Sequence, residues 1–254
     1  MKKLCLILLL FVAQISSGLE PAMLNLKVPS GLEKNQLVFG IQHRFYGKLT
    51  ENPFGTFFGL DAGANVGVNL RYSVWPRLDI YGSYTRWQKE FTLGAGYAYF
   101  IPRLFRSQIN IEYFNYEKLG LPDTISKRRR NFFYSFLLQG EPVVNQIRPT
   151  VNVGYDGYNQ RFGLGLGLDV GFELEIGPIE GMNIIGEYFP IINQDTMVTG
   201  PKNSFAAGIK LNTYGHHFML FIGNNSEIGT RRLMLGTHTN DLFLSFKIHR
   251  FLSF

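Results

Sequence analysis

One segment of the sequence, residues 162–176, alternates between apolar residues and glycine or carboxylate residues at every step. Phe, Leu, Val and Ile occupy the even positions, and Gly, Asp and Glu occupy the odd positions. Successive side chains of a β-strand point to opposite faces, whereas a helix would scatter these residues around its circumference. The segment therefore predicts a strand with one apolar face and one face of glycines and carboxylates.

The same alternation recurs in segments of about ten residues that end at turn residues, which is typical of a transmembrane β-barrel. Aromatic residues make up 15% of the chain and glycine occurs 28 times, as aromatic girdles and strand glycines would require. We expect an all-β fold, an antiparallel transmembrane barrel of about twelve strands. The predicted strands are Gln36–Tyr46, Ala62–Val74, Leu78–Gln88, Glu90–Ile101, Phe105–Tyr116, Asn131–Gly140, Gln146–Asp156, Phe162–Ile176, Met182–Phe189, Asn203–Asn212, His217–Ile222 and Asp241–Phe254.

The lengths of the connections provide an independent test of this strand count. If the first strand runs outward, every long connection falls at the external end, and the periplasmic connections are all short, as in bacterial barrels. The long connections are Gly47–Asp61, Glu117–Arg130, Pro190–Lys202 and Gly223–Asn240. An error in the middle of the strand count would break this regularity.

The polarity of the two faces distinguishes a membrane barrel from a soluble one. A soluble lipocalin-like barrel also alternates, but its apolar face points inward and its charges lie outside. Here the apolar faces carry almost no charge, as expected where a charge facing lipid costs about 2–4 kcal/mol. We therefore expect the apolar faces to contact outer-membrane lipid and the polar faces to line the lumen of a barrel in a diderm bacterium.

The first residues have the features of a secretory signal peptide. Two lysines precede the apolar run Leu4–Val12, and small residues follow at 16–18. The run is too short for a spanning helix, which needs about 20 apolar residues. Cys5, the only cysteine, lies in this region, so no disulfide or thiolate site is expected in the secreted chain. The predicted division is a signal peptide at 1–18, an N-terminal periplasmic segment at 19–35 and the barrel at 36–254.

The last predicted strand alternates up to the aromatic residue Phe254. A final strand that ends in an aromatic residue resembles the targeting signal of outer-membrane barrels, so we expect the barrel-assembly machinery as a partner. Arg250 interrupts the apolar face of this strand. We expect it near the membrane surface, where a long cationic side chain can reach water.

The net charge of the chain is moderate. It is +6, and Lys2 and Lys3 contribute two of these charges, which leaves 6 − 2 = +4 after the signal peptide. The one dense basic cluster, Lys127–Arg130, falls in a predicted loop, either solvated or against anionic lipid head groups. Because a nucleic-acid-binding protein gathers basic residues on one face, we expect no nucleic-acid partner.

Several segments resemble a family of bacterial outer-membrane β-barrel proteins known as a domain of unknown function. They are Phe39–Phe45, Phe58–Asn65 followed by Pro76-Arg77-Leu78, Tyr214–Leu220 and Phe246–Arg250. The resemblance covers nearly the whole chain after the signal peptide. It implies a barrel in the outer membrane and no particular activity.

The residue patterns of an enzyme or metal site are missing from the sequence. No Gly-x-Ser-x-Gly nucleophile elbow occurs. His216 and His217 are adjacent, so in a strand they face opposite sides and make a poor pair of metal ligands. We expect no catalytic activity, metal or cofactor.

The polar faces of the predicted strands supply the candidate lumen-lining residues. One interpretation is a network of paired charges that fills and stiffens the barrel, and the other is a polar permeation path. The candidates are Arg44, Asn65, Arg71, Asp79, Asn110, Glu112, Arg148, Asn152, Asp169, Glu173, Glu175, Glu187, Lys210, Lys247 and His249. The sequence thus favours a channel or transporter for small polar solutes, with a non-transport structural or interaction barrel, acting through its external loops, as the alternative.

The external end of the first hairpin suggests a smaller cluster. Arg44, Asp61 and Asn65 have compatible inward parity if the hairpin pairs across the loop Gly47–Asp61. An arginine fork suits a carboxylate and a neighbouring amide oxygen. We expect either an inward cluster of these three residues that anchors the loop at the mouth, or an Asp61 that merely ends the loop.

Overall fold

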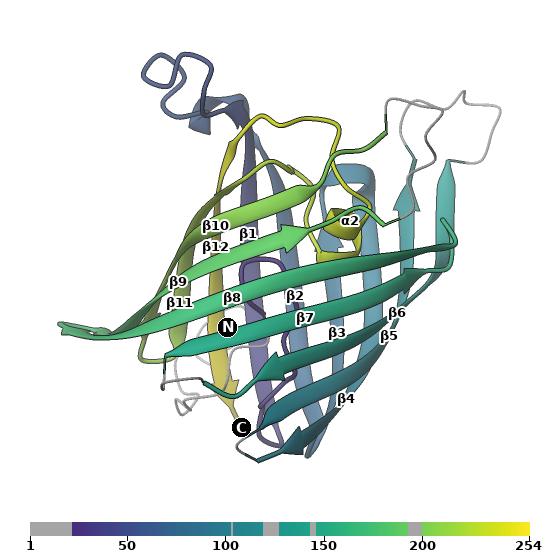
Figure 1. Ribbon diagram of the computed structural model, residues 1–254, viewed down its shortest axis with the longest axis vertical. Helices are drawn as coiled ribbons and strands as arrows, with labels where there is room; N and C mark the ends of the chain where they lie inside the picture. The colour runs from purple at the N-terminus through teal and green to yellow at the C-terminus, as the bar shows by residue number, and fades with distance from the viewer. Residues whose placement is uncertain (1–21, 103, 119–126, 143–145, 193–199) are drawn as a thin grey trace, which may run out of the picture.

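The chain forms a closed barrel of twelve antiparallel strands (Figure 1). The computed structural model describes residues 22–102, 104–118, 127–142, 146–192 and 200–254, so the predicted signal peptide and Cys5 lie outside the described residues. Each strand pairs with its neighbours in sequence, and β1 pairs with β12 to close the barrel. Within these ranges, no helix has the length and apolar character needed to cross a membrane.

The strands agree with the sequence prediction in number and nearly in position. They are β1 (Gln36–Lys48), β2 (Ala64–Trp75), β3 (Leu78–Thr85), β4 (Glu90–Ile101), β5 (Phe105–Glu117), β6 (Arg128–Gly140), β7 (Ile147–Asp156), β8 (Arg161–Ile176), β9 (Ile179–Phe189), β10 (Ser204–Thr213), β11 (His216–Gly223) and β12 (Phe243–Ser253). In the part of the chain that the structure describes, three short helices accompany them, η1 (Leu60–Ala62), η2 (Trp87–Lys89) and α2 (Thr230–Met234).

The basic cluster Lys127–Arg130 differs from its predicted place in a loop. Strand β6 begins at Arg128, because β5 continues to Glu117 and offers a partner strand this far. Arg128 pairs with Glu117 across the ladder, and Arg129 pairs with Tyr116. The cluster therefore lies mostly within the barrel wall, at the external end of β6.

The two faces of the wall are arranged as the sequence predicts for a membrane barrel. On β8, Leu168 is 46% exposed, whereas its neighbour Asp169 is only 4% exposed. Leu70, Ile80 and Leu93 on β2, β3 and β4 are likewise exposed. Apolar side chains thus form the outer surface of the barrel, and polar side chains and glycines point into the lumen.

The connections at one end of the barrel are all short, as predicted, and the long connections lie at the other end, together with the short β3–β4 and β7–β8 connections. The connection between β8 and β9 leaves only Gly177 and Pro178 outside the strands, whereas residues 224–242 connect β11 to β12. In Figure 1 the loops at 49–63 and 224–242 lie at the upper end, and the C-terminus lies at the lower end. The strand directions thus match a barrel whose upper end is external.

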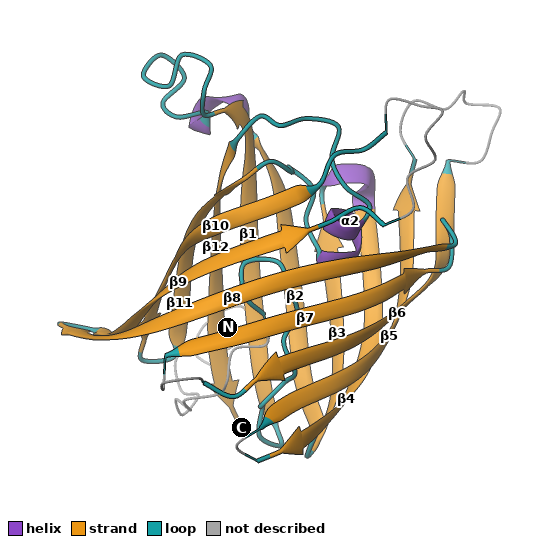
Figure 2. Cartoon of the chain, viewed as in Figure 1, coloured by secondary structure: helices purple, strands orange, loops and turns teal. Residues whose placement is uncertain are grey.

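The segment before β1 does not match the prediction of a periplasmic segment at 19–35. Its described part starts at residue 22 and lies inside the barrel, where Met23, Leu24, Leu26 and Val28 are buried. Figure 2 draws it as a loop enclosed by the strands. We call residues 22–35 the N-terminal plug. Its apolar side chains enter the lumen because the inward positions Gly165 and Gly167 of β8 leave room for them.

Candidate functional site: a lumen filled from both ends

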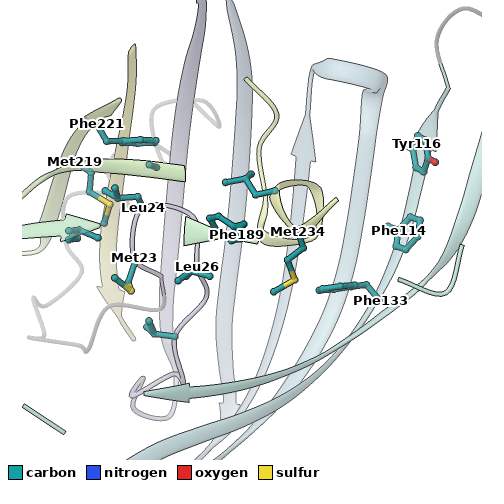
Figure 3. Packing of buried hydrophobic residues seen from close by; sticks show 14 residues of the cluster. Met23, Leu24, Leu26, Phe114, Tyr116, Phe133, Phe189, Met219, Phe221 and Met234 are labelled. Atoms are coloured by element: carbon teal, nitrogen blue, oxygen red, sulfur yellow. The ribbon is translucent and has the colours of Figure 1, made fainter. Parts of the chain in front are cut away.

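Leu26 marks the place where the N-terminal plug packs against the glycine face of β8. A Cβ atom added at Gly165 would lie 2.5 Å from Leu26 Cδ2, and one added at Gly167 would lie 2.6 Å from Leu26 Cδ1. Figure 3 shows Leu26 close to Phe189 of β9 and to Met234 of α2. The plug thus occupies the side of the lumen formed by β8 and β9.

The carboxylate of Glu187, on β9, holds the tip of the plug. Its Oε1 accepts hydrogen bonds from the backbone N–H groups of Asn25, at 2.8 Å, and Leu26, at 2.9 Å. Its Oε2 accepts a third from Asn25 Nδ2 at 2.8 Å. Hydrogen bonds to an ionised acceptor are stronger than neutral ones, so this residue is a main anchor of the plug.

Further polar contacts hold the plug along its length. Ser30 N–H donates to Gln108 Oε1 at 2.7 Å, and Asn152 Nδ2 donates to the carbonyl of Lys27 at 3.0 Å. Lys27 Nζ lies 2.6 Å from Glu112 Oε1. Burial lowers the pKa of Lys27 below its ordinary value, while Glu112 acts in the opposite direction. The backbone of the plug therefore has polar partners on several strands of the wall.

The external loop 224–242 fills the lumen from the other end. Its helix α2 carries two buried arginines, and Arg231 contacts Glu90 at 2.7 Å and Asp156 at 2.9 Å. The Arg231 guanidinium also lies 3.8 Å from the centroid of the Phe114 ring. Burial lowers the pKa of Arg231, but the two carboxylates outweigh it and raise the pKa above its ordinary value. Arg231, Glu90 and Asp156 are not among the residues that the sequence predicts to line the lumen.

The plug and the loop meet inside the barrel. Thr230 Oγ1 donates to the carbonyl of Asn25 at 2.7 Å. Met23, Leu26, Leu233 and Met234 belong to one apolar cluster, which extends to inward aromatic residues of the wall (Figure 3). The two segments therefore form a single packed body in the lumen.

The predicted rim cluster forms only in part. Arg44 and Asn65 are cross-strand partners and both are buried, but Asp61 is exposed in η1. Arg44 donates to Asn25 Oδ1 and to the carbonyl of Asn225. Asn65 Nδ2 donates to the carbonyl of Ser226 at 3.1 Å. The prediction that Asp61 belongs to this cluster is wrong. Arg44 and Asn65 donate instead to backbone carbonyls of the loop 224–242, and Arg44 also donates to Asn25 of the plug.

Most of the predicted lumen residues are buried on the inner side of the wall. The buried ones are Arg44, Asn65, Arg71, Asp79, Asn110, Glu112, Asn152, Asp169, Glu187, Lys210, Lys247 and His249. Arg148 is half-buried, whereas Glu173 and Glu175 are exposed. Figure 1 shows the β8–β9 hairpin extending beyond the neighbouring strands, which accounts for the exposure of these two carboxylates.

Several of these residues pair across the inner wall. Arg71 Nη2 lies 2.9 Å from Asp79 Oδ2, and Lys210 Nζ lies 3.4 Å from Asp169 Oδ2. Asn183 Nδ2 also donates to Asp169. Pairing offsets the cost of removing such charges from water, so the paired-charge network is present within a filled lumen.

Two small cavities with charged side chains in their lining remain between the filling and the wall formed by β12 and β1–β6. One, of about 130 Å³, is lined by Arg71, Tyr81, Lys247 and His249 among others. The other, of about 60 Å³, lies toward the external end and is lined by Glu90, Arg231 and Arg232 among others. The cavities adjoin, because both are lined by Lys27, Ser83, Thr92, Glu112, Ile228, Gly229 and Thr230.

Histidines and acidic residues do not gather into a metal site in the described ranges. No group of three or more His, Cys, Asp or Glu side chains there could hold a metal ion. His216 pairs with Arg250 and His217 with His249 in the β11–β12 ladder, so the adjacent histidines face opposite sides. His216 Nε2 lies 2.9 Å from Arg250 Nη1.

Comparison with known proteins supports the barrel fold. The sequence model of a family described as "Membrane bound beta barrel domain (DUF5777)" matches residues 22–115 and 129–252. No curated protein sequence matches the chain. Solved structures with a similar fold include an outer membrane channel from Pseudomonas putida F1, at 10% identity, a TM-score of 0.49 and coverage of 92% of this chain and 100% of that chain.

Two further solved structures are similar at comparable levels. The outer membrane protein Omp33 of Acinetobacter baumannii is 12% identical, with a TM-score of 0.42 and coverage of 89% of this chain and 100% of that chain. The outer membrane phospholipase A of Escherichia coli is 12% identical, with a TM-score of 0.41 and coverage of 88% of this chain and 91% of that chain.

Proposed function

Because the chain belongs to this family of membrane-bound β-barrel domains, we propose that it is a narrow channel for small polar solutes. It is an integral barrel of the outer membrane of a Gram-negative bacterium, and lipid surrounds its apolar outer face. The observation that carries the proposal is the pair of adjoining cavities beside the N-terminal plug, which have charged side chains in their lining. Solutes move along the β2–β5 side of the lumen, while the plug stays against β8 and β9.

The size of the cavities limits what can pass. Their volumes of about 130 and 60 Å³ are well below the roughly 300–1,000 Å³ of pockets that hold drug-sized ligands. One water molecule needs about 10–15 Å³ of such space. Water, ions and solutes of a few heavy atoms therefore fit, and larger solutes require the filling to move.

Reconstitution of the secreted chain tests the proposal. We expect small, uniform conductance steps in planar bilayers, and swelling of proteoliposomes in glycerol but not in trisaccharides. Thr92→Phe, which fills both cavities, should lower the conductance strongly, whereas Leu93→Phe on the lipid face of the same strand should not. Folded protein that gives neither conductance nor swelling would refute the channel and favour the alternative, a barrel that acts through its external loops.

We also propose that the barrel-assembly machinery recognises β12 and the residue that follows it. Phe254 is 66% exposed and lies beyond the last residue of β12, so it contributes little to packing. An exposed aromatic residue at the strand end is available to a partner during assembly. A comparison of assembly in cells with refolding in detergent tests this role.

A further inference from the structure

We infer that the proposed channel prefers small anions to cations, an inference that rests on the proposed function. The charged residues that line the two cavities are Lys27, Arg71, Arg231, Arg232 and Lys247 on the positive side, and Glu90 and Glu112 on the negative side. The lining thus carries five positive and two negative side chains, an excess of 5 − 2 = +3.

The positive excess belongs to the side chains that face the open space, because carboxylates behind the lining pair with some of its cations. Asp79 pairs with Arg71, and Asp156 pairs with Arg231, without lining either cavity. Glu227 Oε2 likewise lies 3.7 Å from Arg232 Nε without lining either cavity. Adding these three carboxylates gives 5 − 5 = 0. The balancing carboxylates therefore lie behind the lining, and positive side chains predominate at the surface of the open space.

The surroundings of the cavities strengthen this field. Arg71, Arg231 and Lys247 are almost completely buried, and charges interact more strongly away from bulk water. A narrow space lined by one sign of charge between low-dielectric walls concentrates ions of the opposite sign. A small anion therefore gains from the positive excess in the lining, and a cation gains only near Glu90 and Glu112.

Lys27 and Glu112 are central to the preference, because both line both cavities and their charged atoms lie 2.6 Å apart. Lys27 Nζ also lies 4.4 Å from the centroid of the Tyr81 ring, on the wall opposite the plug. Any ion that moves from one cavity to the other passes this pair. The ammonium group attracts an anion at this point, and the carboxylate opposes its passage.

Reversal potentials in a potassium chloride gradient across planar bilayers test the inference. We expect the wild-type chain to prefer chloride to potassium. Lys27→Gln should lower the chloride-to-potassium permeability ratio by about threefold or more, and Glu112→Gln should raise it by a similar factor. Glu175→Gln, an exposed carboxylate on the β8–β9 extension, is the matched control and should leave the ratio unchanged.

The outcomes separate this inference from the proposed function. The anion preference is overturned if the channel conducts but prefers potassium, or if neither substitution changes the permeability ratio. Either result leaves the proposed channel intact. Folded protein without conductance overturns the channel itself. Folding of each variant is checked by heat-modifiable gel mobility, and if Lys27→Gln does not fold, the opposite shift expected for Glu112→Gln still decides the question.

Discussion

Asn25 lies against Glu187 inside the barrel, and the two residues form a two-point contact. The backbone N–H of Asn25 donates to one carboxylate oxygen and its Nδ2 donates to the other, both at 2.8 Å. The residues are 162 positions apart in sequence. This contact joins the tip of the N-terminal plug to the inner wall near the external end of β9, and it leads to the first prediction.

Glu187→Gln should loosen the plug without unfolding the barrel. The amide keeps one acceptor oxygen, but its NH₂ group faces the donor Nδ2 of Asn25. Each lost hydrogen bond to a charged group is worth about 1.5–3 kcal/mol. The free energy of local opening of the plug should therefore fall by an amount of that order. Hydrogen exchange of the Asn25 and Leu26 amides measures this effect. Glu173→Gln, at an exposed carboxylate of β8, should leave their exchange unchanged, and equal protection in both variants would show that Glu187 is not an anchor.

Two neighbouring positions on β8 should respond differently to substitution. Leu168→Arg places a charge on the lipid face, at a cost of about 2–4 kcal/mol near mid-bilayer, and should block assembly. Gly167→Ser should assemble, but its Cβ would meet Leu26 Cδ1 at 2.6 Å and Met23 Sδ at 2.8 Å, so the plug must shift. Heat-modifiable gel mobility reports assembly, and proteolysis of the N-terminal segment reports the shift. Assembly of both variants in equal amounts would contradict the assignment of the two faces.

The strands could be predicted from the sequence because their signal is local. Alternation along 162–176 and the separation of long from short connections depend only on neighbouring residues and on the direction of the chain. The ends of strands are less well determined. Strand β6 is longer than predicted by residues 128–130, because its partner β5 continues to Glu117. The residues of β6 alone do not indicate how far that partner extends.

The filling of the lumen could not be predicted in the same way, because its contacts join distant parts of the chain. The plug is too short for a periodic pattern, and its anchor Glu187 lies on β9. One signal was available: Gly163, Gly165 and Gly167 leave the inner face of β8 without side chains. Since protein interiors are close-packed, another segment must fill that space, and Met23, Leu26 and Met234 do so.

Arg231→Ala should release the external loop 224–242 from the mouth of the barrel. The substitution leaves the buried carboxylate of Asp156 without its guanidinium partner, while Glu90 keeps only Arg232 of its two. Breaking a buried pair in this way costs about 3–5 kcal/mol, which the loop can avoid by moving into solvent. Protease added to intact cells should then cleave within residues 224–242. Arg161→Ala, at an exposed arginine on the same end of the barrel, is the control, and an uncleaved loop in the Arg231 variant would contradict this role of the arginine.

Phe254→Ser should slow assembly in cells without lowering the stability of the finished barrel. Phe254 follows the last residue of β12 and is 66% exposed, whereas Phe251 and Leu252 within the strand are 4% and 3% exposed. The substitution therefore removes little buried apolar area, and the free energy of unfolding in detergent should change by less than about 0.5 kcal/mol. If the assembly machinery recognises the aromatic ring, the amount of folded barrel in the outer membrane should fall severalfold, while refolding of the purified chain proceeds at the wild-type rate. Phe251→Ser is the matched comparison and should impair both, because its ring is packed inside. If Phe254→Ser reduced the amount of folded barrel equally in cells and in detergent, the residue would act in folding rather than in recognition.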